Sequence, residues 1–340
     1  MTLPRTTRST ARRAPNRATA RRTARARDVV EQIGDLLADG GVGTLELGRG
    51  AKLDVTNLDK IFFPKHGYTK GDLMAYYAAV SPMLLPAIAD RPLVLKRFPH
   101  GVTGESFYQQ RAPEDPPDGV RVEPVADEGI KTQARLIGGD LTTLLYIVQL
   151  GAISIDPWHS RIRTVGDADY AIVDLDPGPR ASFRRVVDVA LWVREELERL
   201  GLHGVPKTSG ASGLHVVLPL VAGTPNDTAR LIAEVVATRV AERHPKESTV
   251  TRWVQSRPVS SVYVDFLQNI RGKTVASVYS VRATPDATVS TPLKWEELTP
   301  DLDPREFTIV SVASRLREVG DLWAAGMRRA NDPRRLVGDG

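Results

Sequence analysis

The chain has 340 residues, of which 41% are hydrophobic and 26% are charged, a composition typical of a globular protein with a substantial core. It contains no cysteine, which excludes disulfides, thiolate–zinc sites and a cysteine nucleophile, and it has no uncharged apolar run long enough to span a membrane. The formal net charge of +5 is unevenly distributed, because residues 1–27 contain nine arginines and no acid, whereas the rest carries 37 basic and 41 acidic side chains.

Residues 1–44 are predicted to form a basic, disordered tail, with a short helix over 29–37 and a flexible glycine joint over 40–43. Arginine, threonine, alanine and proline cannot bury enough apolar surface to order such a segment. Its arginines suit salt-sensitive, non-specific binding to nucleic acid, although organellar transit peptides have a similar composition. We expect the folded domain over 45–325 and a C-terminal tail over 326–340.

Helical and β patterns alternate along this domain. Helices are predicted over 69–88, 140–150, 182–200 and 228–243, and strands over 93–98, 106–110, 152–155, 170–176, 205–209, 214–220, 261–266 and 274–281. Thr69 caps the first helix, whereas Pro82 and Pro86 leave two alternatives for its second half, a continued helix or a break at the prolines. The prolines of 111–119 predict a loop. Together these elements predict an α+β (α/β mixed) fold, with a central mixed or antiparallel sheet flanked by helices.

Two carboxylates end the strand predicted over 170–176. Asp174 and Asp176 are two residues apart, so in a strand their side chains point to the same face, whereas Leu175 points to the other. Two carboxylates on one face repel each other unless a cation lies between them, and their oxygens suit Mg²⁺ or Mn²⁺. The alternative is an acidic turn without a ligand, because Asp, Pro and Gly are ordinary turn formers.

A second segment whose residues could bind a ligand joins two predicted strands. Its sequence is Thr208-Ser209-Gly210-Ala211-Ser212-Gly213-Leu214-His215. Its glycines allow close backbone approach, and its amides can cradle phosphate oxygens. His215 begins a strand, from which its ring can reach a bound phosphate. The alternative is a plain hairpin, since short motifs of this kind have many false matches.

A third carboxylate, Asp265, lies within an apolar, aromatic strand and is followed by Gln268, Arg271 and Lys273. An acid in such surroundings is costly unless it is exposed or binds a metal. An edge strand with a polar turn is the alternative interpretation. Taken together, three carboxylates, a phosphate-cradling turn and basic residues form a set suited to phosphoryl transfer with two metal ions.

The order of Asp174-Leu175-Asp176, Ser209-Gly210 with His215, and Asp265 resembles the catalytic motifs of the archaeo-eukaryotic primase superfamily. More closely, the chain resembles the polymerase module of bacterial ligase D, an end-joining repair enzyme. This resemblance covers about residues 53–322, with further matching motifs at 57–64, 69–72, 96–99, 107–109, 279–282 and 295–298. It implies a primase-polymerase-like fold whose central sheet carries the active site.

The resemblance also implies roles for residues at matching positions. Catalysis and the binding of two divalent ions, Mn²⁺ or Mg²⁺, are implied for Asp174, Asp176 and Asp265. Nucleotide binding is implied for Lys96, Arg97, Ser209, His215, Gln268, Lys273 and Arg282. Contact with a DNA 5′-phosphate or with the template is implied for Lys60, Lys70, Phe107 and Tyr108.

Two positions depart from the family pattern. Ser212 stands where members often have a lysine, so one contact to the triphosphate is absent or is supplied elsewhere. Asp156 stands about where many members have a nucleotide-contacting histidine. An acid there adds a metal ligand or repels the triphosphate, and His159 is a neighbouring substitute for the histidine.

The implied activity is that of a template-dependent nucleotidyltransferase that adds ribo- or deoxyribonucleotides to DNA 3′ ends at gaps or double-strand breaks. Implied partners are DNA with a 5′-phosphate, nucleoside triphosphates, a Ku-like end-binding protein and a separate DNA ligase, in the bacterial cytoplasm at the nucleoid. The chain has no Lys-x-Asp-Gly nucleotidylation motif, so we expect a stand-alone polymerase module. A catalytically weak accessory protein that binds DNA ends, or a primase acting on unprimed template, are the alternatives.

Overall fold

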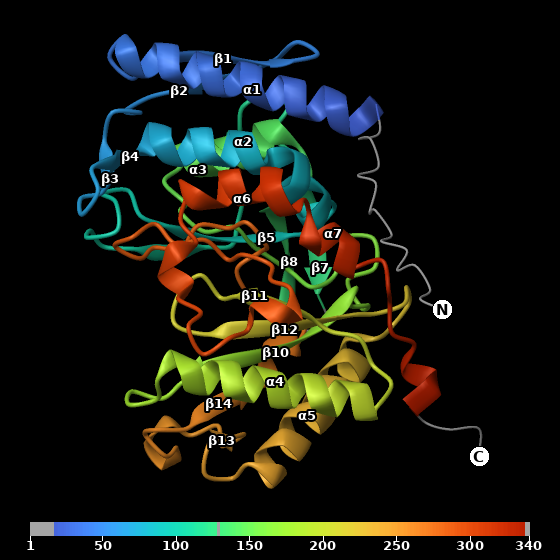
Figure 1. The fold of residues 1–340 in the computed structure, drawn as a ribbon. Coiled ribbons are helices and arrows are strands. Elements are labelled where there is room, and N and C mark those ends of the chain that lie inside the picture. Colours follow the sequence, from blue (N-terminus) through green and yellow to red (C-terminus); the bar gives the residue numbers. More distant parts are fainter. Residues whose placement is uncertain (1–16, 128–129, 337–340) are drawn as a thin grey trace, which may run out of the picture.

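The structure of the chain, a computed structural model, describes residues 17–127 and 130–336 (Figure 1). A five-stranded sheet lies in the lower half of the molecule, with α4 (Phe183–Arg199) and α5 (Asn226–Arg243) packed on one side of it. The upper half contains α2 (Lys70–Ile88) and α3 (Leu141–Gln149) above a smaller sheet. The face of the large sheet that α4 and α5 do not cover is therefore turned toward the upper half.

The large sheet has the strand order β11-β12-β10-β14-β13. Its strands are β11 (Val205–Thr208), β12 (Leu214–Pro219), β10 (Tyr170–Pro177), β14 (Val262–Asp265) and β13 (Ser248–Thr249). Neighbours are antiparallel except for the parallel pair β13 and β14. The predicted α+β fold with a central mixed sheet is confirmed. Strand β10 is buried through Leu175 because its apolar, mostly β-branched residues are covered on both faces.

Side-chain caps explain where the main helices begin. The hydroxyl of Thr69 accepts a hydrogen bond from Asp72 N, and the Asp72 carboxylate accepts one from Thr69 N, which is a complete capping box. The side chain of Ser182 caps α4 by accepting a hydrogen bond from Arg185 N, and that of Asp140 caps α3 by accepting one from Thr143 N. All four predicted helices are confirmed to within about two residues, and Pro82 and Pro86 lie inside α2 without ending it.

Smaller elements complete the upper half. The second sheet has the order β6-β5-β9, and three two-stranded hairpins are formed by β1 with β2, β3 with β4, and β7 with β8. The remaining bounds are β1 (Gly43–Gly48), β2 (Ala51–Val55), β3 (Ile61–Phe63), β4 (Tyr68–Thr69), β5 (Leu93–Arg97), β6 (Phe107–Gln109), β7 (Val122–Asp127), β8 (Ile130–Leu136), β9 (Asp156–Pro157), α6 (Ser311–Val319), α7 (Leu322–Gly326), and the 3₁₀ helices η1 (Val254–Ser256), η2 (Leu267–Asn269), η3 (Trp295–Glu297), η4 (Pro304–Glu306) and η5 (Pro333–Leu336).

Two predicted strands are wrong. Residues 152–155 and 274–281 take part only in isolated bridges, not in ladders. The two segments run past each other, with Ser277 N donating to Ile155 O (2.9 Å) and Ile155 N donating to Ser280 Oγ (2.8 Å). Tyr279 has φ of 63°, in the left-handed region, which breaks an extended strand at that residue.

The prediction of a disordered segment over 1–44 is wrong for the part that the structure describes, and residues 1–16 lie outside the described residues. Helix α1 (Arg17–Ala38) packs against α2, and β1 follows it. Its buried residues Ala26, Val29 and Ile33 recur every three to four positions, which gives one apolar stripe. The average composition of the segment, dominated by arginine, concealed this periodicity.

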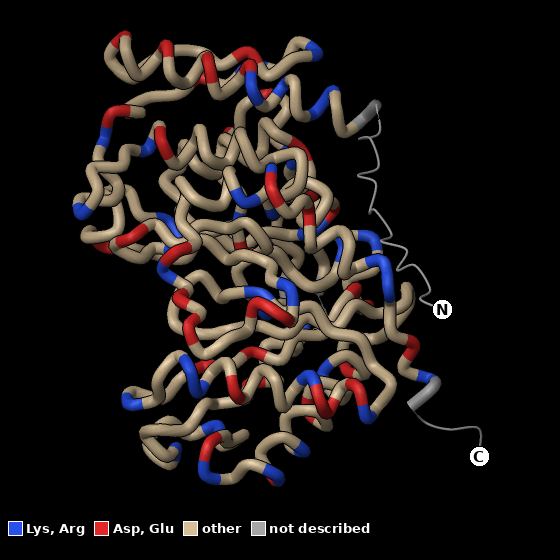
Figure 2. The backbone as a smooth tube through the Cα atoms, viewed as in Figure 1, with Lys and Arg blue, Asp and Glu red and all other residues tan. Residues whose placement is uncertain are grey.

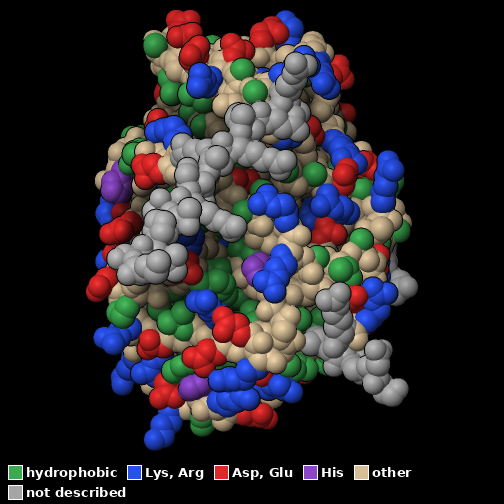
Figure 3. Space-filling view, turned by 45° about the vertical axis from the view of Figure 1, so that its right-hand side comes forward, with side chains coloured by type: hydrophobic (Ala, Val, Ile, Leu, Met, Phe, Trp, Pro, Cys, Tyr) green, Lys and Arg blue, Asp and Glu red, His purple; other side chains and the backbone are tan. Residues whose placement is uncertain are grey.

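Charge is mixed over most of the surface. Figure 2 shows basic residues along the N-terminal half of α1 and acidic residues along its C-terminal half, and Figure 3 shows blue and red side chains interspersed over another face. Among the described residues, no helix combines the length and the apolar character that a bilayer span requires.

If α1 is part of the cooperative fold, removing its apolar contact should lower the stability of the whole domain. We expect Ile33→Ala, at a fully buried position, to reduce the free energy of unfolding by about 2–5 kcal/mol. Leu231→Ala is the matched control, because Leu231 on α5 is 55% exposed, and its effect should stay within about 0.5 kcal/mol. Urea unfolding monitored by circular dichroism measures both. An Ile33→Ala effect no larger than that of the control would show that α1 does not contribute to the cooperative fold.

Candidate active site

Four strands place one residue each in a single row across the uncovered face of the large sheet. Lys207 of β11 is opposite His215 of β12, His215 is opposite Asp174 of β10, and Asp174 is opposite Asp265 of β14. Directly opposed residues of neighbouring strands point to the same face, and so does Asp176, two residues beyond Asp174. The strand register therefore gathers two cationic or titratable nitrogens and three carboxylates on one face.

The three carboxylates form a compact cluster. One oxygen each from Asp174, Asp176 and Asp265 lie within 4.8 Å of one another. Burial raises the pKa of all three carboxyls, and for Asp176 the charges of the other two raise its pKa further. Asp174 and Asp265 are buried and Asp176 is exposed, and so much negative charge in a partly desolvated position is unfavourable without a cation.

The donor set fits a divalent metal ion. Asp174 Oδ1 is buried and accepts no hydrogen bond, although His215 Nε2 lies 3.3 Å from it, and one oxygen of Asp174 lies within 4.8 Å of oxygens of Asp176 and Asp265. Oxygen-only ligands suit hard cations such as Mg²⁺ and Mn²⁺. Among the residues that the structure describes, Asp174, Asp176 and Asp265 form the group that can hold a metal.

The Asp265 carboxylate is held in place by three donors. Tyr263 OH (3.1 Å) and Leu267 N (2.7 Å) donate to its Oδ1, and Gln268 Nε2 (3.0 Å) donates to its Oδ2. Gln268 was expected to bind nucleotide, yet its amide orients an acid of the cluster. Such support keeps a potential metal ligand in one orientation before any ligand arrives.

The chain beyond β14 is fastened to β10 by one asparagine. Asn269 accepts a hydrogen bond from Ile172 N and donates one to Ile172 O, both at 2.7 Å. This pair of bonds continues the sheet pairing through a side chain where the backbone has turned into η2. The position of Asp174 relative to Asp265 is therefore fixed both by the pairing of β10 with β14 and by the Asn269 side chain.

The predicted phosphate-cradling turn between β11 and β12 is tightly closed. Ser209 Oγ accepts hydrogen bonds from Ala211 N (3.1 Å) and Gly213 N (3.0 Å), so its own proton remains available to a ligand. Gly210 has φ of +72°, and a Cβ there would lie 2.6 Å from Cγ of Arg282. Glycine at this position thus lets the Arg282 side chain pack directly on the turn.

His215 is buried beside the acidic cluster. Its Nε2 lies 3.3 Å from Asp174 Oδ1, and its Nδ1 is buried without a hydrogen-bond partner. Burial, with the nearby charge of Lys207, keeps its pKa well below the usual range, so the ring is neutral at physiological pH. A neutral imidazole can accept one proton and donate another at the cluster.

Two cations near the cluster were not anticipated from the sequence. Lys207 is fully buried and donates from Nζ to Ala276 O (3.0 Å) and Ser290 Oγ (2.5 Å), and burial lowers its pKa to about 7. Arg257, which lies 3.4 Å from the ring centroid of Tyr263, lowers the pKa of Asp176 through its charge. The hairpin register was the signal for Lys207, because residues facing His215 across that turn share its face.

Asp156, which departs from the family pattern, and its neighbour His159 have different surroundings. Asp156 on β9 is half-buried and accepts a hydrogen bond from Ser154 Oγ (2.7 Å); desolvation raises its pKa, and the charges of Arg282 and Lys207 oppose that rise. It therefore faces the same group of cations as Asp174. His159 instead packs on Tyr170, with ring centroids 4.9 Å apart, and burial lowers its pKa to about 3.

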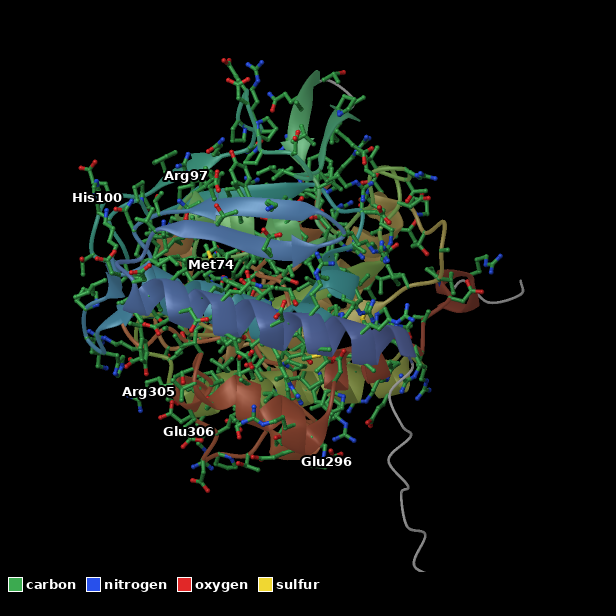
Figure 4. The ribbon with its side chains drawn as sticks, turned by 90° about the horizontal axis from the view of Figure 1, so that it is seen from above. Met74, Arg97, His100, Glu296, Arg305 and Glu306 are labelled. Atoms are coloured by element: carbon green, nitrogen blue, oxygen red, sulfur yellow. The ribbon has the colours of Figure 1, made fainter. Side chains whose placement is uncertain are left out.

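A second group of expected residues lines a separate pocket of about 170 Å³ that includes Lys60, Lys70 and Arg97. Lys60 Nζ lies 3.2 Å from His100 Nδ1, and Figure 4 shows Arg97 and His100 on the same side of the molecule. Lys70 Nζ donates to Gln149 Oε1 (2.9 Å), and burial, aided by the charge of Lys60, lowers its pKa to about 8. Three cations converging on one pocket suit an anion.

The nucleotide residues expected on β5 point to different places. Arg97 lines the Lys60–Lys70 pocket, whereas the charge of its neighbour Lys96 acts on Asp156. Adjacent residues of a strand point to opposite faces, so Lys96 and Arg97 cannot both point toward the acidic cluster. Lys273, also expected there, is exposed in the turn after η2.

Two aromatic side chains next to these cations are exposed to solvent. Phe107 is 48% exposed and Tyr108 is 69% exposed on β6, opposite Arg97 and Lys96 of β5. The Arg97 guanidinium carbon lies 5.2 Å from the Phe107 ring centroid, and Lys96 Nζ lies 5.5 Å from that of Tyr108. Exposed rings beside cations are suited to stacking on bases.

Comparison with known proteins gives consistent matches. The model of the family described as LigD, primase-polymerase domain, matches residues 69–323. The bifunctional non-homologous end joining protein LigD of Bacillus subtilis is 33% identical over 271 residues, covering 79% of this chain and 43% of the relative. The multifunctional LigD of Mycolicibacterium smegmatis is 30% identical over 278 residues, covering 81% and 36%.

A solved structure is also similar. The polymerase domain from Mycobacterium tuberculosis Ligase D, solved in complex with DNA, superposes with a TM-score of 0.75 at 31% identity, covering 82% of this chain and 99% of that domain. The chain spans less than half of the length of the curated relatives just named. The similarity is thus to one domain of a longer protein.

The acidic cluster predicts a pH-dependent stabilisation by metal. Because folding raises the pKa of these carboxyls, the metal-free protein loses stability as pH rises through the raised values, and protons compete with metal below them. Saturating Mn²⁺ should raise the melting temperature by roughly 5 °C at about pH 8 and by much less at about pH 5.5. Differential scanning fluorimetry measures both shifts.

Asp265→Asn should abolish the metal-dependent shift, whereas Asp115→Asn, in the exposed loop 111–119, should retain it. An equal shift at both pH values, or in the Asp265→Asn variant, would place the bound metal elsewhere.

Proposed function

The chain belongs to the LigD primase–polymerase domain family, and on that premise we propose that it is a template-dependent nucleotidyltransferase of DNA end-joining repair. The observation that carries the proposal is the cluster of Asp174, Asp176 and Asp265, assembled by strand register beside a turn that can hold phosphate. The named relatives are end-joining proteins, and the similar domain was solved with DNA, which supports this reaction class.

In the proposed reaction the 3′-hydroxyl of a primer attacks the α-phosphorus of a nucleoside triphosphate. A bond forms between O3′ and phosphorus, the bond to the β-phosphate oxygen breaks, and pyrophosphate leaves. Divalent ions held by Asp174, Asp176 and Asp265 would supply Lewis-acid stabilisation of the attacking and leaving oxygens. The acids are already oriented, since donors fix both oxygens of Asp265.

Neutral and cationic groups around the cluster would bind the triphosphate. Ser209 can donate its free hydroxyl proton to a phosphate oxygen, and Arg282 adds positive charge where it packs on the turn. Lys207, buried behind His215, contributes charge without contacting solvent. These cations offset the repulsion of Asp156, and they compensate for the absence of a lysine at Ser212.

The DNA end would be held at the second pocket. Lys60 and Lys70 would bind the 5′-phosphate at the far side of a gap, and the exposed rings of Phe107 and Tyr108 would stack against the template. The proposed enzyme uses Mn²⁺ or Mg²⁺, accepts ribo- or deoxyribonucleotides, and acts at the bacterial nucleoid with a Ku-like protein and a separate ligase. The end-joining names of its relatives support that setting.

Primer extension on gapped DNA with Mn²⁺ tests the activity directly. We expect extension by the unaltered chain and a loss of at least about a hundredfold in the Asp174→Ala, Asp176→Ala double variant, because transition-state stabilisation depends on these acids. Asp115→Asn should extend normally. Full activity in the double variant would refute the mechanism, and tight end binding without extension under any metal would favour an accessory role.

The phosphate pocket makes a separate prediction about substrate preference. We expect Lys60→Ala to reduce the preference for 5′-phosphorylated over 5′-hydroxyl gapped DNA by about tenfold, as for the loss of one charged contact. Lys246→Ala, at an exposed lysine beyond α5, is the control. Competition binding with fluorescent DNA measures the preference. A uniform loss of affinity for both DNAs would mean that Lys60 contributes only general charge.

A further inference from the structure

The β3–β4 hairpin links the phosphate pocket to a distant tip. Lys60 and Lys70 flank the hairpin directly, and Lys70 N donates to Lys60 O (2.8 Å), which closes its base. At the other end, His66 N donates to Phe63 O (3.2 Å), and the His66 ring stacks on Tyr68 with centroids 5.3 Å apart. Base and tip therefore belong to one short, closed unit.

The loop 282–288 is a second closed unit. Arg282 N donates to Thr288 O (2.8 Å), and the hydroxyls of Thr284 and Thr288 share a hydrogen bond of 2.6 Å. At its base Thr288 Oγ1 donates to Gly210 O (2.5 Å), where Arg282 also packs. Asp286 lies at its tip. The nucleotide-side arginine and Asp286 are thus the two ends of one loop.

The tips of the two units meet. Lys65 Nζ (2.6 Å) and His66 Nε2 (2.8 Å) both contact Asp286 Oδ1, across more than 200 residues of sequence. The Asp286 side chain is 25% exposed, and the hydrogen bond from Lys65, followed by that from His66, keeps its pKa below the usual range. We refer to Lys65, His66 and Asp286 as the clasp.

The base of the hairpin is the part that an anion would change. Without an anion, Lys60 and Lys70 face the same pocket with like charges, and the charge of Lys60 lowers the pKa of Lys70. A phosphate between them replaces repulsion with attraction and restrains the base of the hairpin. Through the clasp, the same restraint reaches the loop that positions Arg282.

We propose that the clasp couples the two sites, so that a 5′-phosphate bound between Lys60 and Lys70 strengthens nucleotide binding beside Arg282, and nucleotide strengthens phosphate binding in return. The inference rests on the proposed function, which assigns these ligands to the two sites. Lys65, His66 and Asp286 act as positioning residues, because they contact neither ligand. The reciprocity follows from thermodynamic linkage between binding equilibria.

Binding measurements without turnover test the coupling. The gapped DNA has a thymine as the templating base and a primer without a 3′-hydroxyl. It is titrated with the full chain in the presence of Mn²⁺, with and without ATP, and fluorescence anisotropy gives the dissociation constant of the protein–DNA complex. The coupling factor is the ratio by which ATP lowers this constant on 5′-phosphorylated DNA, divided by the same ratio on 5′-hydroxyl DNA. We expect a factor of about two to five, the range of partly exposed ion pairs.

Asp286→Asn should bring this factor close to one, and the charge-exchanged variant Lys65→Asp, Asp286→Lys should restore most of it. Asp301→Asn, at an exposed acid outside the clasp, should leave the factor unchanged. If Asp286→Asn lowers the melting temperature by several degrees, the Lys65→Gln, His66→Gln variant provides the same test from the other side.

Three outcomes would overturn the clasp: an unchanged factor in a folded Asp286→Asn variant, equal weakening of ATP binding on both DNAs, or a factor of one in the unaltered chain. If ATP and 5′-phosphate binding are coupled but an unblocked primer is not extended, the polymerase function is refuted and the coupling through the clasp is supported. If the primer is extended but the coupling factor does not depend on Asp286, the polymerase function is supported and the clasp is refuted.

Discussion

Three carboxylates held within one small, largely buried volume are the constraint on which the rest of this structure depends. Asp174, Asp176 and Asp265 raise one another's cost of ionisation, so the surrounding fold must hold them together against both desolvation and repulsion. The register of β10 and β14 brings the acids together, and hydrogen-bond donors hold the Asp265 carboxylate in one orientation. Helices α4 and α5 cover the opposite face of the sheet and make this arrangement rigid.

The cations follow from the same constraint. Lys207 and Arg257 approach the cluster from β11 and from the segment before β14, and each lowers the pKa of an acid that burial raises. Lys207 also faces Asp156, so an acid at that position has a buried partner within the fold. The site thus carries a balanced set of charges into which a metal and a polyphosphate would fit together.

The smaller sheet directs neighbouring cations toward two different places. Strand β5 sends Arg97 toward Lys60 and Lys70, and Lys96 toward Asp156, because successive residues of a strand face opposite sides. The tips of the β3–β4 hairpin and of the Arg282 loop meet at Asp286, so the Lys60–Lys70 pocket and the surroundings of Arg282 are connected. The proposed gap-filling reaction requires a phosphate and a nucleotide to be held at one fixed separation, and this connection would suit that requirement.

Local sequence determined much of this protein. The cap at Thr69, the stripe of apolar residues in α4, and the Asp174-x-Asp176 strand end each depend on neighbours within a few residues, and the elements they predict are present. The mixed sheet followed from the alternation of those elements. The shared face of Asp174 and Asp176 followed from their spacing in a strand, whereas Asp265 was assigned to the same cluster only through resemblance to a family.

The tertiary structure alone decided what depends on register and on contacts between distant segments. It formed a helix from Arg17–Ala38 that packs on α2, bent 274–281 at Tyr279, directed Arg97 into the pocket of Lys60 and Lys70, and turned Gln268 toward Asp265. It also placed Lys207 opposite His215. The physical reason is that pairing energy and burial are set by partners tens to hundreds of residues away, which no local pattern encodes.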